Sequence, residues 1–448
     1  MTAASAIERA EAALTGEERS EIFGWKMFDW GWSAFSTTVV TALLGPYLLE
    51  LIDDDAGVSV LGLRIDEGSF YPYVISLSAV LQVIALPLVG SAADFSSKKK
   101  SIMLTLAYIG SIATIGLFFV VESTVVLGGL LFVVAAVAFS AASVIYNSYL
   151  PDIAPPALRD RISSAGFAVG YMGGALWLAA NFVLILVMED DALAVRLSLG
   201  GTGVWALVFI WWFPGRLLLS RPANRQKPEG IGWLKLSATS VMATLKEIKS
   251  AHPVTFRYLI AYLIFNDGIA TVITVAAVFA ADELDAEATQ LLLLVLLIQV
   301  VAIPGAIAFG RFAERVGAKK ALIVNLCVWV ALVVYAFLVL DNITQLFVMG
   351  FFLALVLGGS QALSRSLYAQ MVPHDRESEF FGFYEIAARG TSWMGPLAFG
   401  VANQVLGSQR QAILILLVFF VLGLALLIPV KVRQGMLDAG QDPTGLVF

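Results

Sequence analysis

Long apolar runs, separated by short polar segments, constrain this chain more than any other feature. A helix that crosses a membrane needs about 20 mainly apolar residues. Twelve segments meet that requirement: 27–50, 70–93, 101–121, 124–149, 163–188, 194–214, 255–281, 288–310, 320–340, 344–370, 380–406 and 411–431. Charged residues make up only 14% of the sequence, against about 25% in ordinary soluble domains. The sequence therefore predicts an all-α membrane protein with twelve transmembrane helices.

The basic residues predict the orientation of these helices. If both ends lie on one side, that side receives the lysine run 98–100 and most of the remaining basic residues. The loops of the other side hold only Arg64, Arg196 and Arg410 and include the acidic run 53–55. Because cytoplasmic loops carry the excess of lysine and arginine, we expect both termini in the cytoplasm. Compact loops favour a prokaryotic plasma (inner) membrane over a vacuolar one.

The longest polar stretch divides the spans into six and six. The predicted parts are a cytoplasmic N-terminal segment 1–24, a first bundle 25–214, a cytoplasmic linker 215–254, a second bundle 255–431 and a cytoplasmic tail 432–448. The N-terminal segment lacks the apolar core of a signal peptide. Residues 233–250 of the linker predict an amphipathic helix, with Leu245 and Ile248 near its apolar face, lying along the inner membrane surface.

The two halves repeat each other. Segments 90–100 and 310–320 share the pattern G-x-x-x-[DE]-x-x-x-x-K-K at an offset of 220 residues. Segments 28–31 (FDWG) and 265–268 (FNDG) occupy matching places in the first and seventh spans. Two parallel six-helix halves around a central cavity are a known plan for secondary transporters. We therefore expect two pseudo-symmetric six-helix bundles that move against each other.

These motifs resemble the major facilitator superfamily, and more closely its vacuole-effluxer-like branch. The matching segments are 28–35, 146–152, 170–174, 262–268, 359–366 and 380–384. The resemblance implies a secondary transporter for a small solute, working by alternating access, with efflux of an amino acid or related metabolite and proton coupling as expectations. The sequence differs from the family pattern in the first span, where Trp32 replaces an amide residue and Phe35 replaces a tyrosine.

Ionisable residues inside membrane spans are costly and are therefore candidates for function. Asp267 lies ten residues after Arg257, about 15 Å along a helix, and with Asn266 it is a candidate for proton or cation coupling. Asp29 occupies the matching place in the first half, although its short distance from Lys26 also allows an interfacial charge. A purely structural carboxylate stays an open alternative for Asp267.

Further candidates lie on the later spans. Glu385 and Arg389 are four residues apart, so they share a helix face and can pair. Arg389 is a candidate clamp for a substrate carboxylate, because its fork matches two oxygens, and Glu385 is its switchable partner. Tyr171, Gln299 and Trp393 are candidates for the cavity lining, with helix packing as the alternative.

The repeated loop motifs suggest a cytoplasmic gate. Asp94 with Lys99, and Glu314 with Lys319, end their helices in the same way, so ion pairs to neighbouring helix ends would hold that side closed. The alternative is a solvated cluster that only sets topology. Asn147 and Arg365 each lie eight residues before a proline at the ends of the fourth and tenth spans. We assign both residues to the cytoplasmic gate. Arg365 is expected to contact a carboxylate in a loop there.

Several other classes of protein are disfavoured. The sequence has one cysteine and two histidines far apart, so no metal site and no cofactor are expected. No grouping of catalytic residues supports an enzyme, and no basic stripe supports nucleic-acid binding. The expected partners are a small-molecule solute, the bilayer and protons, with the protein a monomer. A lipid-handling or sensor protein on a transporter fold remains the alternative function.

Overall fold

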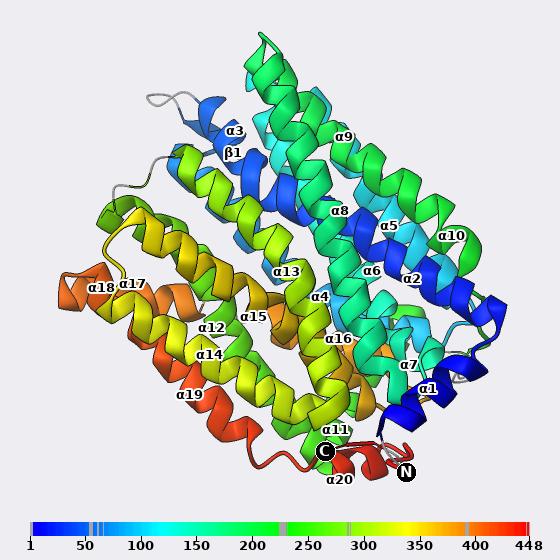
Figure 1. Ribbon diagram of the computed structural model, residues 1–448. Coiled ribbons are helices and arrows are strands. Elements are labelled where there is room, and N and C mark those ends of the chain that lie inside the picture. The colour runs from blue at the N-terminus through cyan, green and yellow to red at the C-terminus, as the bar shows by residue number, and fades with distance from the viewer. Residues whose placement is uncertain are drawn as a thin grey trace.

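The computed structural model describes residues 3–447, apart from 53–56, 61, 66, 224–229, 231, 285, 287, 390–393 and 445. The described chain is almost wholly helical, with one small hairpin of β1 and β2. Figure 1 shows long helices running between two ends of the molecule, with both termini at the same end. We call this the terminal end, and the other the distal end.

The first half contains the following elements: α1 (Ala3–Ala13), α2 (Gly16–Ala34), η1 (Phe35–Leu43), α3 (Leu44–Glu50), β1 (Val58–Val60), β2 (Leu63–Ile65), α4 (Glu67–Asp94), α5 (Lys99–Gly116), η2 (Leu117–Phe119), η3 (Glu122–Thr124), α6 (Val125–Ser148), α7 (Leu150–Ile153), η4 (Pro156–Leu158), α8 (Arg159–Val187), α9 (Asp191–Trp212) and α10 (Pro214–Leu217).

The rest of the chain contains α11 (Trp233–Ser250), α12 (Pro253–Leu284), α13 (Ala288–Val316), α14 (Ala318–Leu338), α15 (Ile343–Gln370), α16 (Glu377–Arg389), α17 (Met394–Leu406), α18 (Gln409–Ala412), α19 (Ile415–Leu427) and α20 (Val432–Asp438). Among the described residues, eleven helices are long and apolar enough to cross a membrane. The remaining expected span, 380–406, corresponds to α16 and α17, which flank residues 390–393.

The first span starts earlier than the sequence predicts. Thr15 caps α2 through its hydroxyl, which accepts from the backbone N–H of Glu18, while the Glu18 carboxylate accepts from the N–H of Thr15. This reciprocal capping box starts the helix at Gly16 rather than at residue 27. Asp29 therefore lies about 20 Å from the start of the helix, and its side chain is buried.

The first span also contains a π-helix, η1, that apolar periodicity did not predict. Its wider turns leave the hydroxyl of Thr41 bonded to the carbonyl of Ser36, five residues earlier. π-Helices are rare and occur mostly as short bulges at functional sites. In this chain η1 directly follows the segment that holds Trp32.

The two halves meet closely at the terminal end. α4 packs against α16, and α8 packs against α13. Gly90 faces the backbone of Ser378, and Gly310 faces the side chain of Ser164, so a methyl group at either glycine would collide with the opposite half. Small residues allow such close approach between membrane helices. The repeated motifs therefore place their first glycines at the contact between the halves.

The helix predicted for residues 233–250 of the linker is present as α11. α11 packs against α4 and α12 at the terminal end (Figure 1). Ile248 is fully buried in this packing, whereas Leu245 is 41% exposed. Polar side chains of the linker helix also find buried partners in the second half.

A polar network between the two halves

Arg365 on α15 is the centre of a buried network. Its side chain is 2% exposed, and its Nη1 lies 3.2 Å from Asn147 Oδ1 and 3.5 Å from Asp29 Oδ2. The same nitrogen lies 3.4 Å from the Tyr146 hydroxyl, and Nη2 donates to the Ser163 carbonyl at 2.8 Å. The expected contact with a loop carboxylate is wrong, since the carboxylate belongs to a membrane helix of the other half.

Asp29 is held by the first half as well. The Tyr146 hydroxyl donates a 2.6 Å hydrogen bond to its Oδ2. The Tyr146 ring stacks between Trp25 and Phe28, with centroid distances of 4.5 and 4.6 Å, and Trp25 Nε1 donates to the Tyr146 carbonyl at 2.8 Å. Aromatic packing thus fixes the phenol, and the phenol fixes the carboxylate.

A second carboxylate extends the network along α16. Asn147 Nδ2 donates to Glu385 Oε1 at 2.7 Å, and Arg389 Nε donates to Glu385 Oε2 at 2.9 Å. The pairing of Glu385 with Arg389 expected from their spacing is therefore present. Two carboxylates and two guanidinium groups, those of Asp29, Glu385, Arg365 and Arg389, balance one another when all are ionised.

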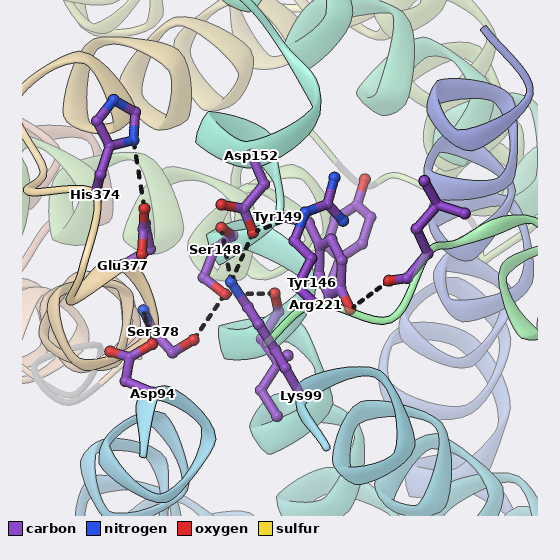
Figure 2. A network of polar contacts seen from close by, with 12 residues as sticks. Asp94, Lys99, Tyr146, Ser148, Tyr149, Asp152, Arg221, His374, Glu377 and Ser378 are labelled. Atoms are coloured by element: carbon purple, nitrogen blue, oxygen red, sulfur yellow. Dashed lines mark hydrogen bonds and ion pairs between the residues drawn. The ribbon is translucent and has the colours of Figure 1, made fainter. Parts of the chain in front are cut away.

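The loop motif of the first half binds the opposite half through backbone groups. Asp94 accepts from the N–H groups of Ser378 and Glu379, at 3.1 and 2.7 Å, in the first turn of α16 (Figure 2). A helix N-terminus offers free N–H groups and favours negative charge. The ion pair expected for Asp94 is thus replaced by a helix end, and Lys99 instead pairs with Asp152 of its own half at 2.9 Å.

The second motif forms the matching contact by an ion pair. Glu314 at the end of α13 accepts from Arg161 Nε, at the start of α8, at 2.9 Å. Arg161 Nη1 also contacts Glu11 of the N-terminal helix α1 at 2.5 Å. Lys319 donates to the Ile428 carbonyl within its own half. In both motifs the acidic residue joins the halves and the lysine stays within one half.

The C-terminal segment covers the same end of the molecule. Arg159 is 1% exposed, and its Nη1 lies 3.1 Å from the Ala369 carbonyl and 3.3 Å from Gln441 Oε1. Gln441 Nε2 in turn donates to the Val372 carbonyl at 2.8 Å. The tail therefore bridges the first residue of α8 and the end of α15.

A further cluster attaches the linker helix. The buried Arg376 donates to Glu247 and Thr244 of α11 and, through Nε at 2.8 Å, to Glu379 of α16. Thr244 also donates to Glu379 at 2.8 Å. Burial lowers the pKa of the neighbouring His252, which favours the neutral form of this imidazole. Sequence reasoning missed this cluster, because its members lie in segments assigned to a linker and a loop.

Asp267 lies apart from this network. Its carboxylate is buried, and neither oxygen has a hydrogen-bond partner of ordinary geometry among the described residues. The neighbouring Asn266 donates to the Ala388 carbonyl of α16 at 2.9 Å. The structure thus separates Asp267 from Asp29, although the repeat assigns them equivalent places.

Of the remaining site candidates, Tyr171 and Gln299 contact the opposite half. The Tyr171 hydroxyl donates to Gln361 Oε1 at 2.6 Å, which joins α8 to α15. Gln299 lies beside Gly174, so it also faces the other half. Trp393 lies outside the described residues. Tyr146 and Gln361 were not selected as site residues, although both stand in the segments that carry the family resemblance.

Twelve apolar segments in two similar halves, joined by ion pairs and hydrogen bonds, define a transporter of the major facilitator superfamily type. The solved structures it is similar to include the proton:xylose symporter XylE (TM-score 0.68, 12% identity, 94% of this chain and 96% of that one) and a bacterial homologue of the iron transporter ferroportin (TM-score 0.65, 13% identity, 94% and 100%). At these identities the likeness shows the fold.

The chain belongs to the family described as "Vacuole effluxer Atg22 like", whose sequence model matches residues 17–440. Among curated relatives, the uncharacterized MFS-type transporter YxiO of Bacillus subtilis is 28% identical, over 90% of this chain and 93% of its own length. Autophagy-related protein 22-1 of Aspergillus fumigatus is 24% identical, over 85% of this chain and 78% of its own length. The family thus includes bacterial and fungal members.

Proposed function

We propose that the protein is a secondary active transporter that moves a small solute by alternating access. The observation that carries this proposal is the polar network of Asp29, Asn147, Arg365 and Glu385, which joins the two halves at a depth where each charge needs a partner. Such contacts can exist in two discrete arrangements when two halves rock against each other. Asp94 and Glu314, with Lys99 and Lys319 supporting them, serve as gate residues of the terminal end.

The terminal end is the cytoplasmic side in this proposal. The excess of lysine and arginine in its loops supports this orientation, and the compact loops favour a prokaryotic inner membrane. The described contacts then correspond to a state closed toward the cytoplasm. Release of the Asp94 and Glu314 contacts would be the step that opens the cytoplasmic side.

The solute we propose is an amino acid or related metabolite, moved outward. The family description as vacuole effluxer supports the direction. Arg389 supports an anionic group on the solute, because a guanidinium binds a carboxylate through two parallel hydrogen bonds. Tyr171, Gln299, Asn266 and Trp393 are the proposed neighbours of the solute path.

The charge balance of the network supports proton coupling in this proposal. Its two carboxylates and two guanidinium groups are neutral together, so a solute whose only charge is a carboxylate would add an uncompensated charge in a poorly solvated place, which costs several kcal/mol. A proton on Glu385 or Asp29 would remove that cost. Asp267, which has no ionic partner among the described residues, is a separate candidate for the coupling site.

Reconstitution of the full-length monomer into liposomes tests the proposal. We expect efflux or uptake of a labelled amino acid or related metabolite that a proton gradient accelerates and a protonophore abolishes. Arg365→Ala provides the inactive control. Movement of a labelled lipid, with none of the screened polar solutes transported, would reject the transporter proposal in favour of the lipid-handling alternative.

A further inference from the structure

Trp32 forms an aromatic surface at the junction between the halves. Its ring is only partly buried, whereas Phe35 and Phe139 behind it are 1% and 0% exposed. Trp32 lies 5.9 Å from Phe35 and 5.3 Å from Phe139 between ring centroids, and the two phenylalanine rings are 5.0 Å apart. The buried rings hold the indole in place and leave it partly accessible.

Arg389 faces this surface from the second half. Its guanidinium carbon lies 5.7 Å from the centre of the Trp32 ring, and its side chain is 36% exposed. Nε is bonded to Glu385, while its two terminal nitrogens make no hydrogen bond within the described part of the chain. A cation with free donors and a flat apolar surface therefore lie side by side, at the end of the buried network.

We propose that Trp32 and Arg389 together select solutes that combine a carboxylate with a flat aromatic group. The carboxylate binds the free end of the Arg389 fork, and the aromatic ring packs on the indole of Trp32. This inference rests on the proposed transport function and names the substrate class of that same site. Trp32 is then a specificity-determining residue of the first span.

The chemistry of the pair argues against the other simple classes. A tryptophan face also attracts cations. Arg389 already supplies a cation near the Trp32 ring, and its positive charge repels a cationic solute. A neutral amide offers one acceptor oxygen and no charge, so it cannot form the two parallel hydrogen bonds and ion pair that a carboxylate forms with the guanidinium. An aliphatic carboxylate forms that pair but lacks the ring geometry, and aromatic pairs contribute free energy beyond the area they bury.

Calorimetric titration of the purified full-length protein separates these contributions. The probes are phenylacetate, its neutral analogue phenylacetamide, its saturated analogue cyclohexylacetate, and acetate. We expect phenylacetate to bind most tightly. Trp32→Ala should weaken phenylacetate about three- to tenfold more than cyclohexylacetate, whereas Trp32→Phe should keep most of the preference. Arg389→Gln should weaken both carboxylates at least about tenfold, with Arg389→Lys intermediate.

Matched controls guard against general damage. Trp212 carries a comparable cation contact, with Arg216 4.0 Å from its ring centre, but it is 49% exposed. Trp212→Ala should leave the titration unchanged, and the melting temperature of each variant reports folding. Equal loss of phenylacetate and cyclohexylacetate in Trp32→Ala would overturn the proposal, as would equal affinity for phenylacetate and phenylacetamide.

A transport assay keeps this inference distinct from the function it depends on. If liposomes containing the protein move leucine or another aliphatic solute with a proton gradient, but phenylacetate neither binds nor competes, the aromatic selectivity is wrong and the transporter proposal stands. If the protein moves no polar solute, the transporter proposal is wrong, and the substrate class inferred from it is wrong as well. Competition by phenylacetate that is lost in Trp32→Ala supports both.

Discussion

The side-chain amide of Asn147 donates a 2.7 Å hydrogen bond to Glu385, across 238 residues of sequence and between the two halves of the molecule. The oxygen of the same amide accepts from Arg365. One amide therefore bridges a carboxylate and a guanidinium group that do not contact each other directly. Any movement that separates the halves at this depth must break both bonds.

Arg365→Ala should destabilise the protein strongly, because it leaves the buried Asp29 carboxylate without its cation. Breaking a buried ion pair by removing one partner typically costs about 3–5 kcal/mol. The double variant Asp29→Asn with Arg365→Ala should be more stable than Arg365→Ala alone. Melting temperatures of both single variants and the double variant give the coupling. Additive losses would show that the two groups do not interact.

Asp94→Asn should weaken closure of the terminal end. The amide keeps the shape of the carboxylate but loses its charge at the N-terminus of α16, an interaction of about 0.3–2 kcal/mol. The closed state should therefore lose population by up to about thirtyfold. Asp341→Asn, at an exposed ion pair with Arg410, is the matched control and should have no effect.

Spin-label distances measure this closure directly. Cys327, the single cysteine of the sequence, is replaced by Ser, and labels are placed at Ser97→Cys and Asp375→Cys. Both positions are exposed and belong to different halves. The interlabel distance should lengthen or broaden in Asp94→Asn. An unchanged distribution would mean that the Asp94 contact does not hold the halves together.

Gly90→Ala should open the terminal end, because the added methyl group clashes with the opposite half. The added methyl group would collide with the backbone oxygen of Ser378, which cannot move away as a side chain would. Gly400→Ala is the matched control, because nothing lies within 4 Å of the place that its added methyl group would take. The same pair of labels should report opening only in Gly90→Ala, and an effect of equal size in both variants would contradict the steric argument.

Asp267→Asn should abolish gradient-driven accumulation but spare solute exchange, if Asp267 carries the coupling proton. The substitution keeps the size of the side chain and removes the charge. Counterflow and gradient-driven uptake in the same liposomes distinguish the two activities. Accumulation that survives the substitution would transfer the coupling role to Asp29 or Glu385.

Arg376→Ala should detach the linker helix α11, since Arg376 joins Thr244 and Glu247 of that helix to Glu379. Amide hydrogen exchange of residues 233–250 should rise by at least about tenfold, the factor that corresponds to a loss of about 1.4 kcal/mol, whereas exchange within α13 should stay unchanged. Arg410→Ala at the distal end serves as the control. Protection that persists in Arg376→Ala would show that apolar packing alone holds the helix.

Much of the fold was predictable because its signals are local. Membrane spans follow from the length of apolar runs, and the G-x-x-x-[DE] repeats mark the glycines and acids that meet the other half. The start of α2 at Gly16 was missed because the segment before residue 27 is polar, and the capping box of Thr15 and Glu18 was not recognised. The π-helix η1 leaves no signal in hydrophobic periodicity.

The site was predictable only in part, because its partners are distant in sequence. Glu385 and Arg389 share a helix, so their spacing alone indicates a pair. The bond of Arg365 to Asp29 joins two helices of opposite halves, and no local pattern indicates which carboxylate an arginine will meet. The contacts of Arg376 with Thr244 were not predictable for the same reason. A linker helix that packs on the protein has the same amphipathic sequence pattern as a helix at a surface.

The balance of charges in the network has a consequence for energetics across the membrane. A membrane potential acts on moving charge by about 2.3 kcal/mol per elementary charge per 100 mV. Asp29 belongs to the first half, whereas Glu385, Arg365 and Arg389 belong to the second, so relative movement of the halves separates a negative charge from a net positive one. In the proposed proton-coupled cycle, the voltage sensitivity is then set by this relative displacement together with the charges of the solute and its proton.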